Sequence, residues 1–385
     1  MPLSARSATA PFIAMDILAE AGRLEAEGRD IVHMEVGEPA YGAPRAAHEA
    51  LAAAQGGLGY TGGLGLPALR EAIAELYARR YGIALPADRI VVTAGSSAGF
   101  VLAFLALFDA GARVALADPG YPAYRNILGT LGLTAVRIEA TPETRYQPTP
   151  ALLSAAAAAE DAIGGLILAS PSNPTGTMLD APTLAALIDA CAASGVSLVA
   201  DEIYHGLTYD APAPTALAHT DEVVVINSFS KYWAMTGWRI GWMVVPEAMV
   251  RPVQNLAQNL FICAPHPAQI AAIGALSEAG EAEAASHMAA YRANRERMIA
   301  TLQTLGFTGI APADGAFYAY ASLPEGTPDS TAFCQRLLSE YGVAATPGLD
   351  FDPLRGNRTV RFSYAQSPER IEEGCSRLAK MMAAG

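Results

Sequence analysis

The sequence is poor in charge, and the charge that it carries is mostly acidic. Charged residues make up 16% of the 385 residues, and 25 Lys plus Arg against 38 Asp plus Glu give a formal net charge of −13. A chain without a basic patch lacks the attraction that holds proteins on nucleic acid or on anionic membranes. We therefore expect no nucleic acid and no membrane among its partners.

Cysteine is also scarce, and the four that occur are far apart in the chain. Their spacing fits none of the common zinc motifs, so we expect no metal site. Isolated cysteines of this kind are typical of small, buried or partly buried thiols in a reducing compartment. They are Cys191, Cys263, Cys334 and Cys375.

Long hydrophobic runs are absent. The most apolar window, AGFVLAFLALF, is too short to span a bilayer, and Asp109 and Arg113 follow it. The N-terminal segment has only a short apolar run, which Asp16 interrupts, and this does not fit a signal peptide. The sequence therefore predicts a cytoplasmic protein.

Short apolar or β-branched runs alternate with helical or Ala-rich stretches up to about residue 246. This alternation is typical of a mostly parallel sheet covered by helices on both faces. Helices are predicted at residues 12–28 and 67–81. Strands are predicted at residues 89–95, 112–118, 135–140, 164–170, 197–202, 223–229 and 241–246.

The pattern changes after about residue 270. Residues 268–304 are rich in Ala, Glu and Arg and predict one or two long helices, and another helix is predicted near 329–341. We predict a large α/β domain over residues 40–270 and a smaller α+β domain over residues 1–39 and 271–385.

Lys231 follows the apolar strand VVVIN within a few residues. An amine among apolar neighbours has a physical cause for a lowered pKa, which a nucleophilic lysine needs. Ser228, Ser230 and Arg239 supply hydroxyl and guanidinium donors that suit a phosphate monoester. From these residues alone, a solvated surface lysine remains the alternative.

Other polar residues follow predicted strands, where ligands of open α/β sheets bind. Asp201 ends the apolar strand SLVAD, and a buried carboxylate there needs a cation, although helix capping is the alternative. Asn173 in SPSNPTG is by itself only a turn residue. Ser96 and Ser97 in TAGSSAGF could bind an anion through backbone N–H groups or simply cap a helix.

Eight segments stand in an order and spacing that resemble one family: GEP, YTGGLGLPALREAI, TAGSSAGF, DPGYPAY, SPSNPTG, ADEIY, SFSKYWAMTGWRIGW and VRFSYA. Over roughly residues 10–380, the chain is similar to the class I/II aminotransferases of the fold-type I, aspartate aminotransferase-like superfamily. Their cofactor is pyridoxal 5′-phosphate. The resemblance implies that Lys231 attaches this cofactor as an internal aldimine and moves the substrate proton, and that Asp201 pairs with the pyridine nitrogen.

The resemblance also assigns the remaining site residues. It implies that Asn173 and Tyr204 bind the phenolic oxygen, that Tyr121 stacks on the ring, and that Asn173–Pro174 is a cis peptide. Arg361 is expected to bind the substrate carboxylate, with Asn173 and the backbone of Gly37 beside it. The expected phosphate ligands are Ser96, Ser97, Ser228, Ser230, Arg239 and, from the neighbouring subunit of a homodimer with shared active sites, Tyr60.

The function that the resemblance implies is transfer of an amino group from an L-amino acid to a 2-oxo acid. Another reaction of the same cofactor, such as β-elimination by a C–S lyase, is the alternative. A non-enzymatic transcription regulator is disfavoured because the aminotransferase pattern begins almost at once. Residues 259–270 offer His266 and no Arg for the distal carboxylate of a dicarboxylate donor, and the sequence does not place Arg125.

Overall fold

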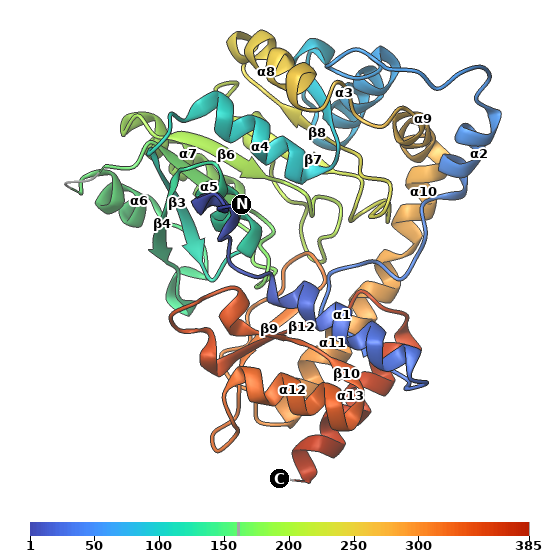
Figure 1. The fold of residues 1–385 in the computed structure, drawn as a ribbon, viewed down its shortest axis with the longest axis vertical. Helices are drawn as coiled ribbons and strands as arrows, with labels where there is room; N and C mark the ends of the chain where they lie inside the picture. Colours follow the sequence, from blue (N-terminus) through green and yellow to red (C-terminus); the bar gives the residue numbers. More distant parts are fainter. Residues whose placement is uncertain (160–161, 385) are drawn as a thin grey trace.

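A computed structural model describes residues 1–159 and 162–384. Figure 1 shows a large sheet with its helices in the upper part of the view and a smaller group of strands and helices below it. In this view the helix α1 (Ile13–Ala26) lies at the upper edge of the smaller group, to which α11 (Met288–Thr304) also belongs.

The seven predicted strands form one sheet in the order β2-β8-β7-β6-β5-β3-β4. The strands β3 to β7 pair in parallel, and β8 is antiparallel to both of its neighbours, β2 and β7. The prediction of a mostly parallel sheet is confirmed. The strands are β2 (Ile90–Thr93), β3 (Arg113–Asp118), β4 (Thr134–Glu139), β5 (Gly165–Ala169), β6 (Ser197–Asp201), β7 (Val224–Ser228) and β8 (Gly241–Val244).

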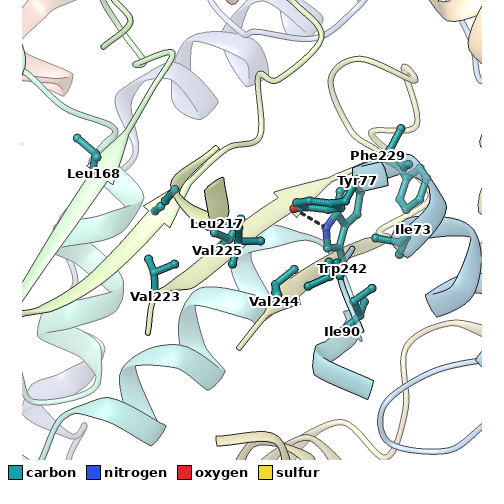
Figure 2. Close-up of a cluster of buried hydrophobic side chains, with 14 of the residues drawn as sticks. Ile73, Tyr77, Ile90, Leu168, Leu217, Val223, Val225, Phe229, Trp242 and Val244 are labelled. Carbon is teal, nitrogen blue, oxygen red and sulfur yellow. Dashed lines mark hydrogen bonds between the residues drawn. The ribbon is translucent and has the colours of Figure 1, made fainter. Parts of the chain in front are cut away.

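Alternate side chains of these strands enter two separate cores, one on each face of the sheet. In β5, Leu166 and Leu168 belong to one cluster of buried residues and Ile167 to the other. Figure 2 shows part of the first cluster, where the indole N–H of Trp242 donates to the Tyr77 hydroxyl at 3.4 Å. Because both faces are covered, the inner strands are mostly apolar, which is why the sequence shows them as continuous runs, whereas the edge strand β4 is largely exposed.

Helices cover the sheet on both faces. The helix α3 (Pro67–Tyr81) ends where Gly82 adopts the left-handed conformation at φ 69°. The helix α1 ends at Ala26, two residues before Gly28 at φ 89°, close to the predicted end. The remaining helices of this part are α2 (Arg45–Ala53), α3 (Pro67–Tyr81), α4 (Ser96–Leu107), α5 (Pro122–Thr130), α6 (Pro150–Ala157), α7 (Ala181–Ala193) and α8 (Glu247–Leu260).

The smaller group contains a three-stranded antiparallel sheet and a two-stranded parallel pair. The sheet has the order β11-β12-β9, with β11 at Thr346–Pro347, β12 at Thr359–Ser363 and β9 at Tyr318–Ser322. The pair joins β1 (Val32–His33) to β10 (Val343–Ala344), so the N-terminal segment lies against the C-terminal part of the chain. The helices α12 (Ser330–Tyr341) and α13 (Pro368–Ala383) complete it.

The prediction of one or two long helices over residues 268–304 is wrong. The structure has three: α9 (His266–Ala275), α10 (Glu278–Ser286) and α11. The Ser277 side chain accepts the N–H of Gly280 at 3.2 Å and so starts α10, a cap that the Ala- and Glu-rich composition conceals. The buried side chains of α9 belong to the first core of the large sheet, and the boundary predicted after residue 270 falls inside this helix.

The four cysteines are free, with Cys263 partly exposed and the other three buried, as predicted. A search of the helices over residues 1–159 and 162–384 finds none long and apolar enough to cross a membrane.

Candidate active site

One cavity of about 300 Å³ lies where the strands of the large sheet end. All the predicted site residues except Tyr60 and Ser228 line it. They are Gly37, Ser96, Ser97, Tyr121, Asn173, Asp201, Tyr204, Ser230, Lys231, Arg239 and Arg361.

Lys231 enters the cavity from the turn that follows β7. Its ammonium group donates to the carbonyl oxygen of Gly37 at 2.5 Å. Burial and, as a smaller effect, the nearby Arg361 cation together lower the pKa of Lys231 to about 8. The amine is thus available without its proton at mildly alkaline pH, as a nucleophile or proton acceptor requires.

Asp201 lies at the end of β6, buried at 4% exposure. It accepts hydrogen bonds from the Tyr124 hydroxyl and, at 3.1 Å, from the Ile203 N–H. Burial raises its pKa to about 6. In the described part of the chain, no basic side chain forms an ion pair with it, so a cation is needed in the cavity. A protonated pyridine nitrogen fits this requirement.

The start of α4 lines one end of the cavity. Gly95 at its N-cap has φ 80°, and a Cβ there would overlap the guanidinium of Arg239. The backbone N–H groups of Ser96 and Ser97 in the first turn, the Arg239 cation and the Ser230 hydroxyl therefore converge on one place. This donor set fits a phosphate monoester.

Arg361 occupies the opposite end, on β12, with 3% of its surface exposed. One nitrogen donates to the Asn173 side-chain oxygen at 2.9 Å, and another donates to the Glu35 carbonyl. The guanidinium lies 4.5 Å from the centre of the Tyr318 ring and 4.6 Å from that of Phe351. A planar cation held this rigidly is suited to bind a carboxylate with both nitrogens.

The approach of Tyr318 explains why residue 37 is glycine. A Cβ on Gly37 would overlap the Tyr318 hydroxyl, which in turn lies 2.8 Å from the Tyr204 hydroxyl. The peptide bond Asn173–Pro174 is cis, as predicted.

Two predicted residues lie outside the cavity. Ser228 is fully buried, with its hydroxyl 2.9 Å from that of Ser230 and 3.0 Å from the Ile240 carbonyl. Tyr60 is 83% exposed and lines a separate surface groove with Phe261 and Ile262.

Several lining residues were not predicted. Tyr124 follows Tyr121 by three positions at the start of α5, and this helical spacing could have revealed it. Tyr318 faces the cavity from β9, and Phe12, Met15 and Leu18 do so from the start of α1.

The two unplaced basic residues are now located. Arg125 donates to the carbonyl oxygen of Asp350. A ring nitrogen of His266 lies 2.7 Å from the Gly59 carbonyl, beside the groove of Tyr60.

The mostly parallel sheet, the buried lysine and carboxylate, and the anion-binding helix start define a fold-type I, pyridoxal-phosphate-dependent enzyme. The family model described as aminotransferase class I and II matches residues 29–378. The chain belongs to this family and is an amino-acid transaminase with pyridoxal phosphate as its cofactor.

Relatives resemble the chain over almost its whole length. The valine–pyruvate aminotransferase of Mycobacterium tuberculosis is 47% identical, over 98% of this chain and 97% of that protein. A crystal structure of an aminotransferase from Mycobacterium tuberculosis has a TM-score of 0.96 and 45% identity, with full coverage of both chains. The aspartate aminotransferase of Thermus thermophilus with maleate has a TM-score of 0.92 and 31% identity, covering 99% of each chain. These names favour the transaminase over the C–S lyase alternative.

Proposed function

We propose that this transaminase takes its amino group from an apolar L-amino acid such as valine and passes it to pyruvate or another small 2-oxo acid. The observation that carries the proposal is the set of cations around the cavity. Among the described lining residues these are Lys231, Arg239 and Arg361, each with a role in the reaction that any donor would share. Arg125 does not line the cavity and donates to the Asp350 carbonyl, which disfavours it as a partner for the distal carboxylate of a dicarboxylate donor. The name of the 47% identical relative points the same way.

Five residues hold the ring of the cofactor under this proposal. Lys231 attaches it, Asp201 pairs with its pyridine nitrogen, and Tyr121 stacks on it. Asn173 and Tyr204 bind the phenolic oxygen. The buried Asp201 carboxylate supports the assignment because a cation beside it removes the cost of burying its charge.

The phosphate group lies against the start of α4. Ser96 and Ser97 bind it through backbone N–H groups, and Ser230 and Arg239 bind it through their side chains. Ser228 acts indirectly, because its hydroxyl lies 2.9 Å from that of Ser230 and fixes its orientation. The positive end of the helix dipole adds to the attraction.

The reacting residues divide the work between proton transfer and orientation. When bound, pyridoxal phosphate supplies a sink for the electron pair that the donor's α-carbon keeps as its proton leaves. Lys231 takes that proton at Nζ, for which a pKa of about 8 suits it, and later returns it. Arg361 holds the donor's carboxylate, which fixes the α-carbon near Lys231.

We also propose a homodimer with shared active sites, in which Tyr60 reaches the phosphate held by the neighbouring subunit. Five exposed apolar side chains, from the loop before α3 and from the end of α8, form what we call the apolar patch. They are Leu58, Tyr60, Leu260, Phe261 and Ile262.

A cytoplasmic location is proposed because four free thiols suit a reducing compartment.

The attachment of the cofactor can be tested directly, because the sequence contains only two lysines, Lys231 and Lys380. Borohydride reduction of the loaded protein, followed by digestion and mass spectrometry, is expected to place the cofactor on Lys231. Lys231→Ala should lose the adduct and nearly all turnover, whereas the exposed Lys380→Ala should keep both. An adduct on Lys380 would overturn the assignment.

The choice of donor is tested by a screen of L-amino acids with pyruvate as acceptor. Valine and similar apolar donors are expected to give a higher kcat/KM than aspartate, with the cofactor absorbance as the readout. A preference for aspartate would contradict the proposal, and so would release of ammonia without any acceptor.

A further inference from the structure

We propose that α1 is the wall of the cavity that selects the donor's side chain, and that Asp350 is the positioning residue that holds this wall in place. The inference rests on the proposed apolar donor and names the residues that would choose it. Its evidence comes from the lining of the cavity and from contacts at the N-terminus of α1.

In the part of the cavity assigned to neither cofactor nor carboxylate, α1 contributes more lining residues than any other element, beside Val36, Glu38, Ile203 and Thr236. Ala14, Met15 and Leu18 face it from one side of the helix, because residues three and four apart share a face. The following turns of the helix, with Ala21 and Leu24, pack into a separate buried cluster that anchors α1. A donor held by its carboxylate and its nitrogen therefore presents its side chain to α1.

The start of α1 has no cap of its own. Its N-cap residue is Phe12, whose side chain has no hydrogen-bond acceptor. The first-turn N–H groups are satisfied instead by Asp350, which lies more than 330 residues further along the chain. Its carboxylate oxygens accept the N–H of Ile13 at 3.1 Å and of Ala14 at 3.2 Å. A buried carboxylate at this position satisfies two orphaned donors and complements the helix dipole.

The short segment around Asp350 also touches the other parts of the site. The Asp350 carbonyl accepts from Arg125 on α5, and the neighbouring Phe351 ring packs against Arg361 at 4.6 Å. The Phe351 carbonyl accepts the N–H of Gly120 at 3.1 Å, just before the expected ring-stacking Tyr121. The position of α1 is thereby fixed relative to both the carboxylate site and the ring site.

Phe12 makes a second connection between α1 and the ring site. Its ring meets that of Tyr121 edge to face, with centroids 5.7 Å apart. Loss of the Asp350 contacts would free the start of α1 and with it Phe12 and Met15. A donor whose side chain reaches α1 would then lose binding, while alanine, whose single methyl is short, would lose less.

Two substitutions test the wall and its support. Leu18→Ala is expected to lower kcat/KM for valine relative to alanine by about tenfold or more, since contacts of a methylene or two discriminate by this amount. Asp350→Ala should raise the KM for valine about tenfold, as loss of a cap would, with a smaller change in kcat. Asp350→Asn should recover most of the loss because its amide oxygen still accepts an N–H.

The matched control is Asp329→Ala. Asp329 caps α12 in the same way, accepting the N–H of Thr331 at 2.9 Å and of Ala332 at 3.0 Å, and it does not line the cavity. Its loss should leave the ratio between valine and alanine unchanged. Unchanged ratios in both Leu18→Ala and Asp350→Ala, or a ratio that Asp329→Ala shifts equally, would overturn the proposal.

Amide hydrogen exchange tests the same idea without turnover. Addition of 3-methyl-2-oxobutanoate to the loaded enzyme, with no donor present, should slow exchange in residues 13–26 more than pyruvate does. Asp350→Ala should speed exchange there in the free enzyme. Exchange in α1 that ignores both the ligand and the substitution would overturn the role of α1 while leaving the transaminase assignment intact. If the wild-type enzyme transferred no amino group from any apolar donor, the proposed function itself would be wrong.

Discussion

At the scale of single residues, the contact between Tyr124 and Asp201 sets the charge in the deepest part of the site. Two opposing effects act on Asp201: burial raises its pKa, and the hydrogen bond from Tyr124 lowers it. The result, about 6, keeps the carboxylate charged at neutral pH with little margin. A small change in its surroundings should therefore alter the pH dependence of the enzyme.

Tyr124→Phe removes the hydroxyl donor and is expected to raise the pKa of Asp201. Because the charged carboxylate is the form that we propose pairs with the pyridine nitrogen, the acidic limb of the kcat/KM profile should move to higher pH. The shift should be about one pH unit, since a hydrogen bond to a charged group contributes about 1.5 kcal/mol and one unit corresponds to about 1.4 kcal/mol. Activity should fall more at pH 6 than at pH 8.

The control for this measurement is Tyr146→Phe. Tyr146 donates to the Gly309 carbonyl at 3.2 Å, outside the cavity, so its profile should match that of the wild type. An acidic limb that stays in place in Tyr124→Phe would show that Asp201 is not the group that titrates there.

Asp201 could be predicted as a site residue from the sequence, but the hydrogen bond that Tyr124 donates to it could not. A carboxylate that ends an apolar strand is visible in a single segment, as is a lysine soon after such a strand. The partner of Asp201 lies 77 residues earlier in the chain, and Asp350 lies 336 residues from Ala14. Contacts of this length depend on packing, which local patterns do not contain.

At the scale of elements, the turn between β2 and α4 combines two constraints at one residue. Gly95 has φ 80°, which side-chain-bearing residues rarely adopt, and it lies against the Arg239 guanidinium. A side chain at residue 95 is therefore expected to strain the backbone and to crowd the Arg239 guanidinium. Of these two effects, only the crowding of Arg239 should alter the proposed phosphate site.

Gly95→Ala is expected to weaken binding of pyridoxal phosphate about tenfold or more, because Arg239 must move to admit the methyl group. The measurement is the dissociation constant of the cofactor, together with the melting temperature. Gly82→Ala is the matched control, since Gly82 has φ 69° but open space around its Cβ position. It should cost about 1 kcal/mol of stability and leave cofactor affinity unchanged. Equal cofactor affinities in the two variants would contradict the role of the turn.

The elements themselves were predicted well where the burial pattern is simple. The inner strands of the large sheet are buried on both faces, so they appear as apolar runs, and the prediction of α3 from Pro67 to Tyr81 agrees with the structure. The break between α9 and α10 was missed because it depends on Ser277 in a segment of uniformly high helix propensity.

At the scale of the whole molecule, the apolar patch around Tyr60 should determine the oligomeric state. The wild type is expected to have a mass of about 80 kDa in solution, twice the 40.1 kDa of one chain. Phe261→Asp combined with Ile262→Asp removes about 3–6 kcal/mol of apolar burial at the interface and should give monomers with weaker cofactor binding. Light scattering after gel filtration provides the mass.

The comparison for this experiment is Leu354→Asp, a substitution of an even more exposed apolar residue outside the patch. It should remain dimeric. A double variant that keeps the mass of the wild type would show that the patch is not the interface.

The division into residues 40–270 and residues 1–39 with 271–385 stays a prediction, and with it the expectation that the two parts close on a bound carboxylate. Ion pairs already join them: Arg137 binds Asp352 at 2.8 Å, and Arg145 binds Asp314 at 2.7 Å. We expect the part that carries Arg361 to move toward the large sheet when a dicarboxylate inhibitor binds. Crystal structures with and without the inhibitor check this, and identical positions of the two parts would count against it.

The scarcity of lysine has a practical consequence. Lys380 is exposed near the end of α13, at the opposite end of the smaller part from the large sheet (Figure 1), while Lys231 is enclosed in the cavity. Amine-reactive supports can therefore capture the folded enzyme only through Lys380 or the N-terminal amine. With the N-terminus blocked, every molecule would be tethered by the same helix, with the large sheet and its cavity directed away from the support.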